Sequence, residues 1–421
     1  MRNPLKPISI SLSPNTQADD VKLAFSLLFR PKLWLLGNAV NELERGFREY
    51  LGVKHAYSFN SGRSALVAIL DALGLEKGSQ VLLQAFTCNA AVNPIRWAEL
   101  EPVFVDCDRN YNLSAADLKK KITEKSRAVM VQHTFGLPAD IDEIKKICDD
   151  NNLILIEDCA HSLGAEYKNK KVGTFGRAAF FSFGRDKIIS CVYGGMAVTN
   201  SEALARKLAA YQKNCGDPGR AWTLQQLLHP VLMNWLILPT YSIFGRYLLV
   251  LLQWLHVLSK AIHQKEKRGL KPDYFPKCLP NALAILAANQ IKKIDEFWRH
   301  RQSVAKYYSN ELKGSEFVLP VVLSDRKDAR LRFAVRNKNA AKIIKFSWRK
   351  NLLIGDWYRT PVDPSDTRPE AVGYKKGTCP NAEEFAGKMI NLPTHINING
   401  RSAKKIVTSI KNANKHRRNR K

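Results

Sequence analysis

Acidic residues are scarce in this chain of 421 residues. It holds 38 Asp and Glu against 66 Lys and Arg, which gives a formal net charge of +28. A field of this sign favours polyanionic partners, namely nucleic acid, anionic lipid or phosphorylated substrates. No zinc-finger spacing or RNA-binding aromatic signature accompanies the charge, so nucleic acid is the least favoured of the three. Residues 411–421 read KNANKHRRNRK, which predicts a solvated basic tail whose charge attracts phosphates.

Paired cysteines and a long apolar run at the N-terminus are also missing. The eight cysteines are scattered without a C-x-x-C pair, and several lie in apolar runs where Cys packs as a small apolar residue. The pattern argues against a disulfide framework and for a reducing cytoplasm, and we expect no metal site. The first 14 residues, MRNPLKPISISLSP, have no continuous apolar stretch, so we expect no secretory signal.

Short apolar runs alternate with amphipathic stretches from about residue 55 to residue 200. Helical patterns occupy Ser64–Leu73 and Ala139–Asp150, among others. Strands that alternate with helices predict an α/β fold with a mostly parallel sheet covered on both faces. The predicted strands are Val81–Phe86, Pro102–Cys107, Ala128–Thr134, Leu153–Asp158, Ala178–Phe183 and Met196–Thr199.

The chain divides into four expected parts. Residues 1–215 form a large domain built on that sheet, and residues 216–271 form an apolar helical insertion. Residues 272–400 begin with a linking helix and continue as a smaller C-terminal α/β domain, and residues 401–421 form the basic tail. The elements expected after residue 271 are a helix over Ala282–Tyr308, strands over Phe317–Leu323 and Leu331–Val335, and a helix over Ala340–Lys350.

Residues 221–259 break the α/β pattern. Arg246 is their single Lys, Arg, Asp or Glu, and the stretch is long enough to span a bilayer, although Pro230 and Pro239 interrupt it. Three interpretations stay open: a buried helical hairpin or dimer contact, helices lying on the inner face of a membrane, and a transmembrane span. A basic cluster directly follows, as attraction to anionic lipid requires: Lys260, Lys265, Lys267, Arg268 and Lys271.

A lysine and an acid lie on the same side of the predicted sheet. Lys187 follows the apolar run that ends at Phe183, and Asp158 closes the earlier run LILIED. In such sheets, ligands bind beyond the carboxyl ends of the strands, where both residues stand. Pyridoxal phosphate needs this layout, because a lysine forms the Schiff base and an acid keeps the pyridine nitrogen protonated. The pairing predicts an enzyme that uses this cofactor.

Further candidates for this site also have a purely structural interpretation. The turn over residues 60–66 opens a helix whose free N–H groups attract an anion such as a phosphate, although a serine there would cap any helix. Ser182 lies close enough to Lys187 to donate its hydroxyl to the same phosphate. His161 and Phe86 follow strand ends, and each has two interpretations: a contact with the cofactor or an ordinary place in the core.

Five short motifs occur in a fixed order along the chain. They are small-Gly-x-Ser-Ala-Leu at 61–66, Pro-Val-Phe-Val-Asp at 102–106, Gly-Leu-Pro-Ala-Asp at 136–140, Glu-Asp-x-Ala-His-Ser-Leu-Gly-Ala at 157–165 and Ser-Phe-x-x-x-Lys at 182–187. Together they closely resemble the DegT-type sugar aminotransferases, which are pyridoxal phosphate enzymes of the aspartate aminotransferase fold (fold type I). The similarity runs over roughly residues 35–215 and 280–395.

The resemblance implies a role for each candidate residue. Lys187 is then the Schiff-base lysine and proton shuttle, and Asp158 is the partner of the pyridine nitrogen. His161 approaches the ring oxygen, and Phe86 stacks on the ring. The residues implied at the cofactor phosphate are Gly62, Arg63 and Ser182.

The resemblance also implies a reaction and partners. An amino acid, glutamate by resemblance, gives its amino group to a keto sugar on a nucleotide or lipid diphosphate carrier, and the enzyme is a homodimer. A sugar dehydratase of the same family is one alternative, but such enzymes typically carry histidine where this chain has Lys187. A catalytically degenerate, membrane-associated protein of the same fold is another.

Three departures from the family pattern are visible. Tyr193 takes the place of the acid in the usual Gly-Glu-Gly-Gly, and Arg63 takes the place of Thr in Gly-Thr. The family's Asn-x-Arg segment, which sends an asparagine into the neighbouring subunit's phosphate site, is not recognisable. Pro276–Lys277–Cys278 stands there instead, with Lys277 as the residue that could replace it.

Overall fold

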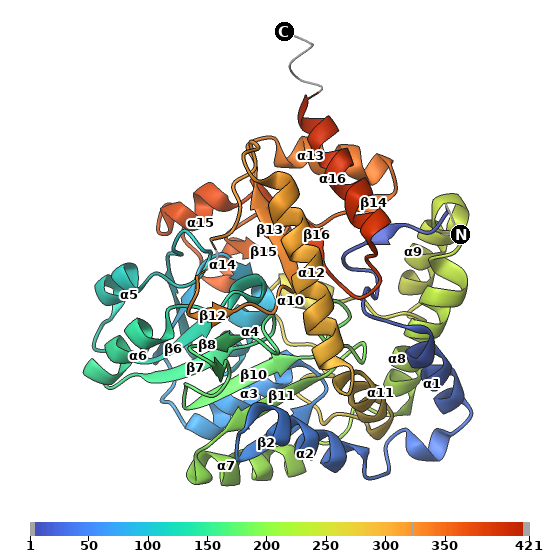
Figure 1. The fold of residues 1–421 in the computed structure, drawn as a ribbon. Coiled ribbons are helices and arrows are strands. Elements are labelled where there is room, and N and C mark those ends of the chain that lie inside the picture. Colours follow the sequence, from blue (N-terminus) through green and yellow to red (C-terminus); the bar gives the residue numbers. More distant parts are fainter. Residues whose placement is uncertain (1–4, 322, 416–421) are drawn as a thin grey trace.

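A seven-stranded sheet forms the centre of the protein in a computed structural model that describes residues 5–321 and 323–415 (Figure 1). The strand order is β2-β11-β10-β7-β6-β3-β5, and only β11 runs antiparallel to its neighbours β2 and β10. The predicted mostly parallel sheet is therefore confirmed. Its strands are β2 His55–Phe59, β3 Gln80–Gln84, β5 Glu101–Val105, β6 Ser126–Gln132, β7 Ile154–Asp158, β10 Ala178–Ser182 and β11 Gly195–Thr199.

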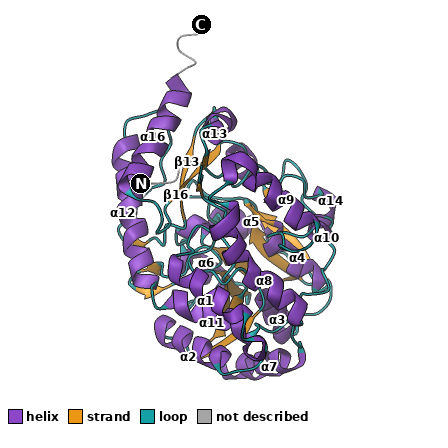
Figure 2. Ribbon diagram, turned by 90° about the vertical axis from the view of Figure 1, so that its right-hand side faces the viewer, coloured by secondary structure: helices purple, strands orange, loops and turns teal. Residues whose placement is uncertain are grey.

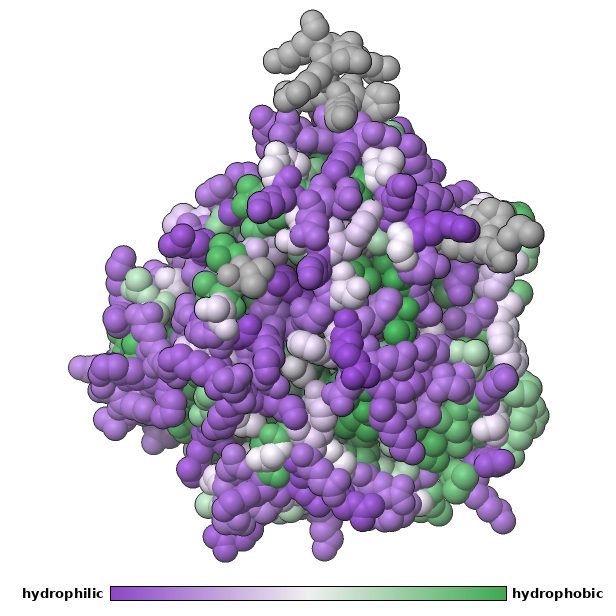
Figure 3. Space-filling model, in the orientation of Figure 1, coloured by the Kyte–Doolittle hydropathy of each residue, from purple (hydrophilic) through white to green (hydrophobic). Residues whose placement is uncertain are grey.

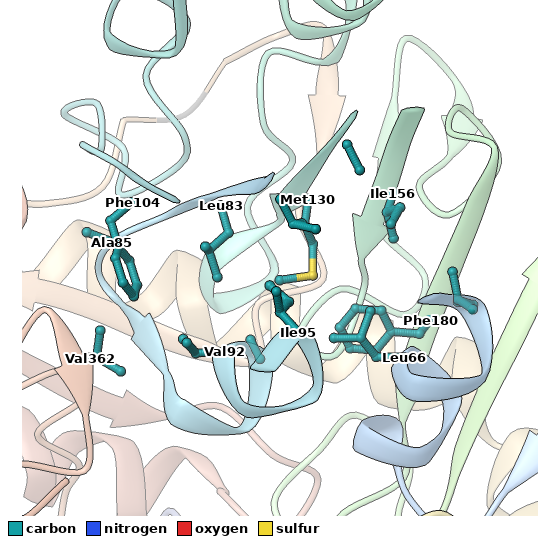
Figure 4. Close-up of a cluster of buried hydrophobic side chains, with 14 of the residues drawn as sticks. Leu66, Leu83, Ala85, Val92, Ile95, Phe104, Met130, Ile156, Phe180 and Val362 are labelled. Atoms are coloured by element: carbon teal, nitrogen blue, oxygen red, sulfur yellow. The ribbon is translucent and has the colours of Figure 1, made fainter. Parts of the chain in front are cut away.

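Helices cover both faces of this sheet (Figure 2). Leu82 and Leu83 point to opposite faces of β3, and both are buried, as a two-sided parallel sheet requires. On one face the strands share an apolar cluster with α3 (Gly62–Leu73), α4 (Asn89–Trp97) and α7 (Glu202–Asn214) (Figure 4). The other face packs against α2 (Ala39–Leu51), α5 (Ala115–Lys121), α6 (Ile141–Asp150) and α11 (Asn281–Ile291).

A smaller C-terminal part packs beside this core. Its sheet pairs β13 (Arg332–Arg336) with β16 (Met389–Pro393) in antiparallel register. The helices α12 (Ile294–Leu312), α13 (Ala340–Arg349) and α16 (Gly400–Lys415) share its apolar cluster. Short elements complete it and its links to the core: β12 Arg326–Lys327, β14 Leu352–Leu353, β15 Val362–Asp363, α14 Pro369–Val372 and α15 Pro380–Phe385.

The remaining elements lie before and between the strands of the core. The short pieces are β4 Thr87–Cys88, η2 Thr134–Gly136, β8 Glu166–Tyr167 and β9 Lys170–Lys171. At the N-terminus stand β1 (Ile8–Ser9), α1 (Ala18–Leu28) and η1 (Pro31–Leu33). β1 pairs in parallel with β14, so the first residues join the C-terminal part. The expected division placed these residues in the large domain, whereas their strand pairs with the C-terminal part.

Three other expectations need correction after residue 271. The helix expected over Ala282–Tyr308 is two helices, α11 and α12, with a break at residues 292–293. The strand expected over Phe317–Leu323 is wrong for its described residues, where only Val318 bridges to Arg336. The solvated tail expected over residues 401–421 is wrong for residues 401–414, because α16 packs there on the C-terminal part. Residues 416–421 lie outside the described chain.

The apolar segment, residues 221–259, folds as helices joined by tight bends. They are α8 (Arg220–Leu232), the π-helical turns η3 (Met233–Ile237) and η4 (Tyr241–Gly245), and α9 (Arg246–Trp254), with the short α10 (Gln264–Lys267) beyond. Within the described residues no single helix could cross a membrane, but the pair Arg220–Ile237 and Tyr241–Trp254, bent by 110°, passes by length and composition. The segment is neither wholly buried nor wholly exposed, since Met233 and Ile237 are core residues whereas Trp254 is 71% exposed.

Candidate active site

A cavity opens beyond the carboxyl ends of β7 and β10. Trp357 and Tyr358 from the C-terminal part line one side of it, and Ala261 and Ile262, which follow the apolar segment, line another. The cavity brings together six of the seven residues that the sequence assigns to the site: Gly62, Arg63, Asp158, His161, Ser182 and Lys187.

Lys187 lies on the loop that follows β10. The loop turns back after the strand, and the Lys187 N–H donates to the Gly184 carbonyl at 3.1 Å. The Nζ atom lies 5.2 Å from the centroid of the Trp357 ring. Burial lowers the pKa of Lys187, because an ammonium loses its hydration there. The amine is thus more readily neutral, as a nucleophile must be.

Asp158 is the last residue of β7, and its Oδ1 accepts a hydrogen bond from the Ala160 N–H at 2.9 Å. Burial raises the pKa of this carboxyl to about 6, although the Ala160 N–H and the charge of Lys187 both lower the pKa. The carboxylate is desolvated on the wall of the cavity. It therefore suits a partner that brings its own positive N–H, such as a protonated ring nitrogen.

The neighbouring acid, Glu157, has a different role. Its carboxylate accepts the N–H groups of Gly173, Phe175 and Gly176 at 2.7 to 2.8 Å, and it contacts His133 Nε2 at 3.2 Å. It points to the opposite side of the strand from Asp158, as successive residues of a strand do. Glu157 therefore fixes the loop after β9, and Asp158 alone is available to a ligand.

His161 is held flat between two aromatic rings. It stacks on Phe135 at an interplanar angle of 5° and on Trp357 at 21°, with centroids 6.2 and 5.6 Å away. Its Nδ1 faces the Phe135 N–H at 3.4 Å. Burial, and then the positive charges of Lys187 and Arg332, lower the pKa of His161 well below the usual value. The imidazole is neutral, with its plane fixed along the cavity wall.

The start of α3 forms the anion-binding end of the cavity. Ser61 caps the helix by accepting the Ser64 N–H at 3.0 Å, so the first turn presents its dipole to the cavity. A Cβ at Gly62 would come within 3.1 Å of Ser182 Cβ, and one at Gly195 would come within 2.4 Å of Gly62 N. The two glycines thus allow the helix end, Ser182 and β11 to approach one another closely.

The sequence as a whole identifies the kind of protein to which this cavity belongs. The chain matches the model of the DegT/DnrJ/EryC1/StrS aminotransferase family over residues 16–229 and 275–411. The chain belongs to this aminotransferase family. Pyridoxal phosphate is its cofactor, and the amine, the buried carboxylate and the helix start fit that cofactor at its aldehyde, ring nitrogen and phosphate.

Individual members of the family align along most of the chain. The GDP-perosamine synthase of Caulobacter vibrioides is 27% identical over 379 residues, which cover 89% of this chain and 90% of that protein. A dTDP-3-amino-3,6-dideoxy-alpha-D-galactopyranose transaminase of Aneurinibacillus thermoaerophilus is 24% identical, over 93% of this chain and 94% of its own. The solved structure of Helicobacter pylori PseC, an aminotransferase of pseudoaminic acid biosynthesis, superposes with a TM-score of 0.75 at 22% identity and covers 97% of this chain and 99% of PseC. The PseC likeness shows the aminotransferase fold.

Phe86 does not line the cavity in this structure, although its family position predicts a ring that stacks on the cofactor. The residue follows β3 with φ at 68°, and its side chain is fully buried against Tyr111 and Tyr358, with ring centroids 5.7 and 5.2 Å away. It lies one layer behind the wall. The aromatic side chains on the wall itself are Phe180, Tyr193, Trp357 and Tyr358.

Arg63 lines the cavity, but its charge is already paired. The guanidinium forms an ion pair with Glu266, donates to the Ala261 carbonyl at 3.2 Å and lies 4.5 Å from the Phe275 ring centroid. Burial lowers the pKa of Arg63, but the Glu266 carboxylate outweighs this effect and raises it overall. Its side chain therefore holds residues of this chain rather than an open anion site.

The segment that Arg63 holds is a strap over residues 259–266, and two of its residues, Ala261 and Ile262, line the cavity. The Tyr193 hydroxyl donates to the Lys260 carbonyl, and Arg185 donates to Ser259 Oγ. Arg63 and Tyr193, two departures from the family pattern, thus both bind the strap. The family match leaves out residues 230–274, so the strap has no counterpart in that pattern. Reasoning from motifs could not place it.

Proposed function

We propose that this aminotransferase moves an amino group from an amino acid, glutamate by resemblance to the family, to a keto sugar carried on a diphosphate. The observation that carries the proposal is that the buried amine of Lys187 and the buried carboxylate of Asp158 line one cavity with a helix start. Two relatives, a GDP-perosamine synthase and a dTDP-amino sugar transaminase, support a nucleotide as the carrier. A lipid diphosphate is the second carrier we propose to test.

We assign the roles of the chain's residues from the family resemblance and from their common cavity. Pyridoxal phosphate supplies the electron sink of the reaction. Lys187 binds the cofactor covalently and, once released by the amino substrate, moves a proton to and from the substrate carbon with its Nζ. Asp158 would keep the ring nitrogen protonated, His161 would contact the ring oxygen, and Gly62 and Ser182 would hold the phosphate.

Borohydride reduction of the holoenzyme followed by peptide mapping tests this assignment. We expect the reduced cofactor on Lys187, and we expect Lys187→Ala to abolish transamination while still binding the cofactor noncovalently. A label on any other lysine would refute the assignment. Wild-type enzyme whose cofactor absorbance does not respond to amino donors would favour the degenerate alternative. The presence of Lys187 disfavours a sugar dehydratase, because such enzymes typically carry histidine at this position.

We propose further that the protein is a homodimer, as the family resemblance implies, and that it works in the cytoplasm on an anionic membrane surface. An apolar patch on its exterior supports the second part. Phe25 of α1 and Trp235 of η3 are in contact, with ring centroids 4.9 Å apart, so the two segments form one surface. Figure 3 shows green residues gathered on the side where α1 and α8 lie. The patch consists of the exposed Phe25, Phe29, Leu33, Leu36, Trp235, Leu236, Ile243, Phe244, Tyr247, Val250, Leu251, Trp254 and Leu255.

The charges around this patch favour lipid over a second copy of the chain. Residues 21–38 and 220–263 carry the patch and contain no Asp or Glu. A symmetric contact between two copies would bring their identical cations together without an acid to pair them. An anionic bilayer instead offers apolar burial for the patch and opposite charge for its rim. The basic residues of the two segments are Lys22, Arg30, Lys32, Arg220, Arg246 and Lys260.

A further inference from the structure

Arg185 stands on the wall of the cavity, two residues before Lys187. Its side chain is 8% exposed, and the cavity that it lines also contains the start of α3 and Ser182. Its guanidinium carbon lies 5.4 Å from the Tyr193 ring centroid, and that of Arg63 lies 5.8 Å from the same ring. The Arg185 charge is therefore close to the anion-binding end of the site.

The charge of Arg185 lacks the partner that other buried arginines of this region have. Arg332 pairs with Asp186 at 2.7 Å, Arg330 with Asp328 at 2.6 Å, and Arg63 with Glu266. Among residues 5–321 and 323–415, no carboxylate lies within ion-pair distance of Arg185. Its side-chain hydrogen bond goes to the neutral Ser259 Oγ. Its Nε has no partner among the described residues, which is also true of the Nε atoms of Arg301, Arg330 and Arg332, so the difference lies in its terminal nitrogens.

Arg301 is a buried arginine whose two terminal nitrogens have several acceptors, although it has no carboxylate partner among the described residues. These nitrogens donate to the Leu331 carbonyl, Thr394 Oγ1 and Asn15 Oδ1 at 2.7 to 3.0 Å. Arg185 has one such acceptor. A desolvated cation with so few acceptors is unfavourable unless an anion completes the site.

We propose that Arg185 is the cation that binds a phosphate group in this cavity, together with the N–H groups at the start of α3 and the Ser182 hydroxyl. The inference rests on the proposed function, because it concerns the phosphate of the cofactor or that of the sugar carrier. It assigns different tasks to the two arginines. Arg63, paired with Glu266, positions the strap, and Arg185, free of a carboxylate, binds the ligand while it donates one hydrogen bond to the strap at Ser259. A guanidinium suits this task because its planar donors match phosphate oxygens.

A pair of probes that differ by one phosphate tests the proposal. Pyridoxal phosphate and pyridoxal are titrated into the cofactor-free wild type and into Arg185→Gln, and the ratio of their dissociation constants is compared. We expect Arg185→Gln to reduce the preference for the phosphorylated form by about tenfold to a hundredfold, the size of a lost charged hydrogen bond. Arg185→Lys should retain part of the preference. The exposed Arg177→Gln serves as the matched control and should change neither constant.

A second titration separates the two sources of phosphate. GDP and dTDP are titrated into the holoenzyme, and a loss of their affinity in Arg185→Gln with an unchanged cofactor preference assigns the phosphate to the carrier. The proposal is overturned if neither preference changes, or if the affinities for pyridoxal and pyridoxal phosphate fall equally with the melting temperature, as a purely structural role requires. Failure of the proposed function looks different, because borohydride would then trap neither probe on Lys187.

Discussion

At the residue scale, Asp158 destabilises the cofactor-free protein. Burial raises its pKa from 3.8 to about 6, so this cost is complete above pH 6 and absent below about pH 4. A shift of this size corresponds to about 3 kcal/mol. We predict that Asp158→Asn raises the melting temperature of the apoprotein at pH 8 but not at pH 4. It should also lower turnover by at least about a hundredfold, because an amide cannot keep the ring nitrogen protonated.

Asp108 provides the matched control for this variant. Burial also raises its pKa to about 6, but it lies outside the cavity, where it accepts the N–H groups of Asn110 and Asn112. Asp108→Asn should change the pH dependence of melting in the same direction and leave turnover unchanged. Near-normal turnover in Asp158→Asn would show instead that Asp158 only caps the loop after β7.

The sequence predicted those cavity residues that stand at or just after the ends of the core strands. Lys187 and Asp158 stand at strand ends, and parallel strands bring such ends together. Trp357 and Tyr358 could not be predicted, because they reach the cavity from a distant part of the chain with no local signal. Arg63 could be placed in the cavity, but its pairing could not, since Glu266 comes from a segment outside the family pattern.

At the element scale, the strap depends on the Arg63–Glu266 pair. Glu266 is fully buried, so its replacement leaves the guanidinium without its partner. We predict that Glu266→Gln lowers the free energy of unfolding by about 3 to 5 kcal/mol, the cost of breaking a buried pair. The double variant Arg63→Thr, Glu266→Gln should lose less than Glu266→Gln alone. Urea unfolding of both variants and of each single change measures this coupling.

The exposed pair of Lys77 and Glu99 is the control for that cycle. Both side chains are mostly in solvent, so Glu99→Gln should change stability by less than about 1 kcal/mol. Equal losses in Glu266→Gln and Glu99→Gln would mean that the strap does not depend on the buried pair.

Elements were predictable where local pattern and packing agree. The six strands expected between residues 81 and 199 all exist, because they are buried on both faces and read as plain apolar runs. The strand expected at Phe317–Leu323 failed for the opposite reason: β-forming residues are not enough where no neighbouring strand offers a ladder, and only Val318 finds a partner. The α11–α12 break also escaped detection, because apolar periodicity continues across residues 292–293.

At the scale of the whole molecule, we predict reversible, salt-sensitive binding to anionic vesicles. Val250 and Trp254 are 65% and 71% exposed on α9, so replacing them with glutamate should abolish flotation without disturbing the core. Binding of the wild type should weaken as salt screens the basic rim. Val318→Glu, at an exposed site outside the patch, is the control and should still float.

The same variants test whether a second copy of the chain, rather than a membrane, buries the patch. If the wild type fails to float at low salt, and Val250→Glu, Trp254→Glu changes the subunit count in solution, the patch is a contact between two copies. A soluble nucleotide carrier is then the better substrate to test. The sequence could not make this choice, because apolar composition is the same for a buried hairpin and for a surface helix, and only the fold shows which side chains remain exposed.

The pairing of β1 with the C-terminal part has a consequence for the synthesis of the chain. The Ser9 carbonyl bonds to His395 Nε2 across 386 residues of sequence. At roughly 5 to 20 residues per second, the first strand emerges from the ribosome on the order of 20 to 80 seconds before this partner exists. Ile8 and Ile10, buried in the finished protein, stay without their final contacts throughout that time. The first residues can therefore reach their final place only after the C-terminal part has been synthesised, and local folding alone cannot position them.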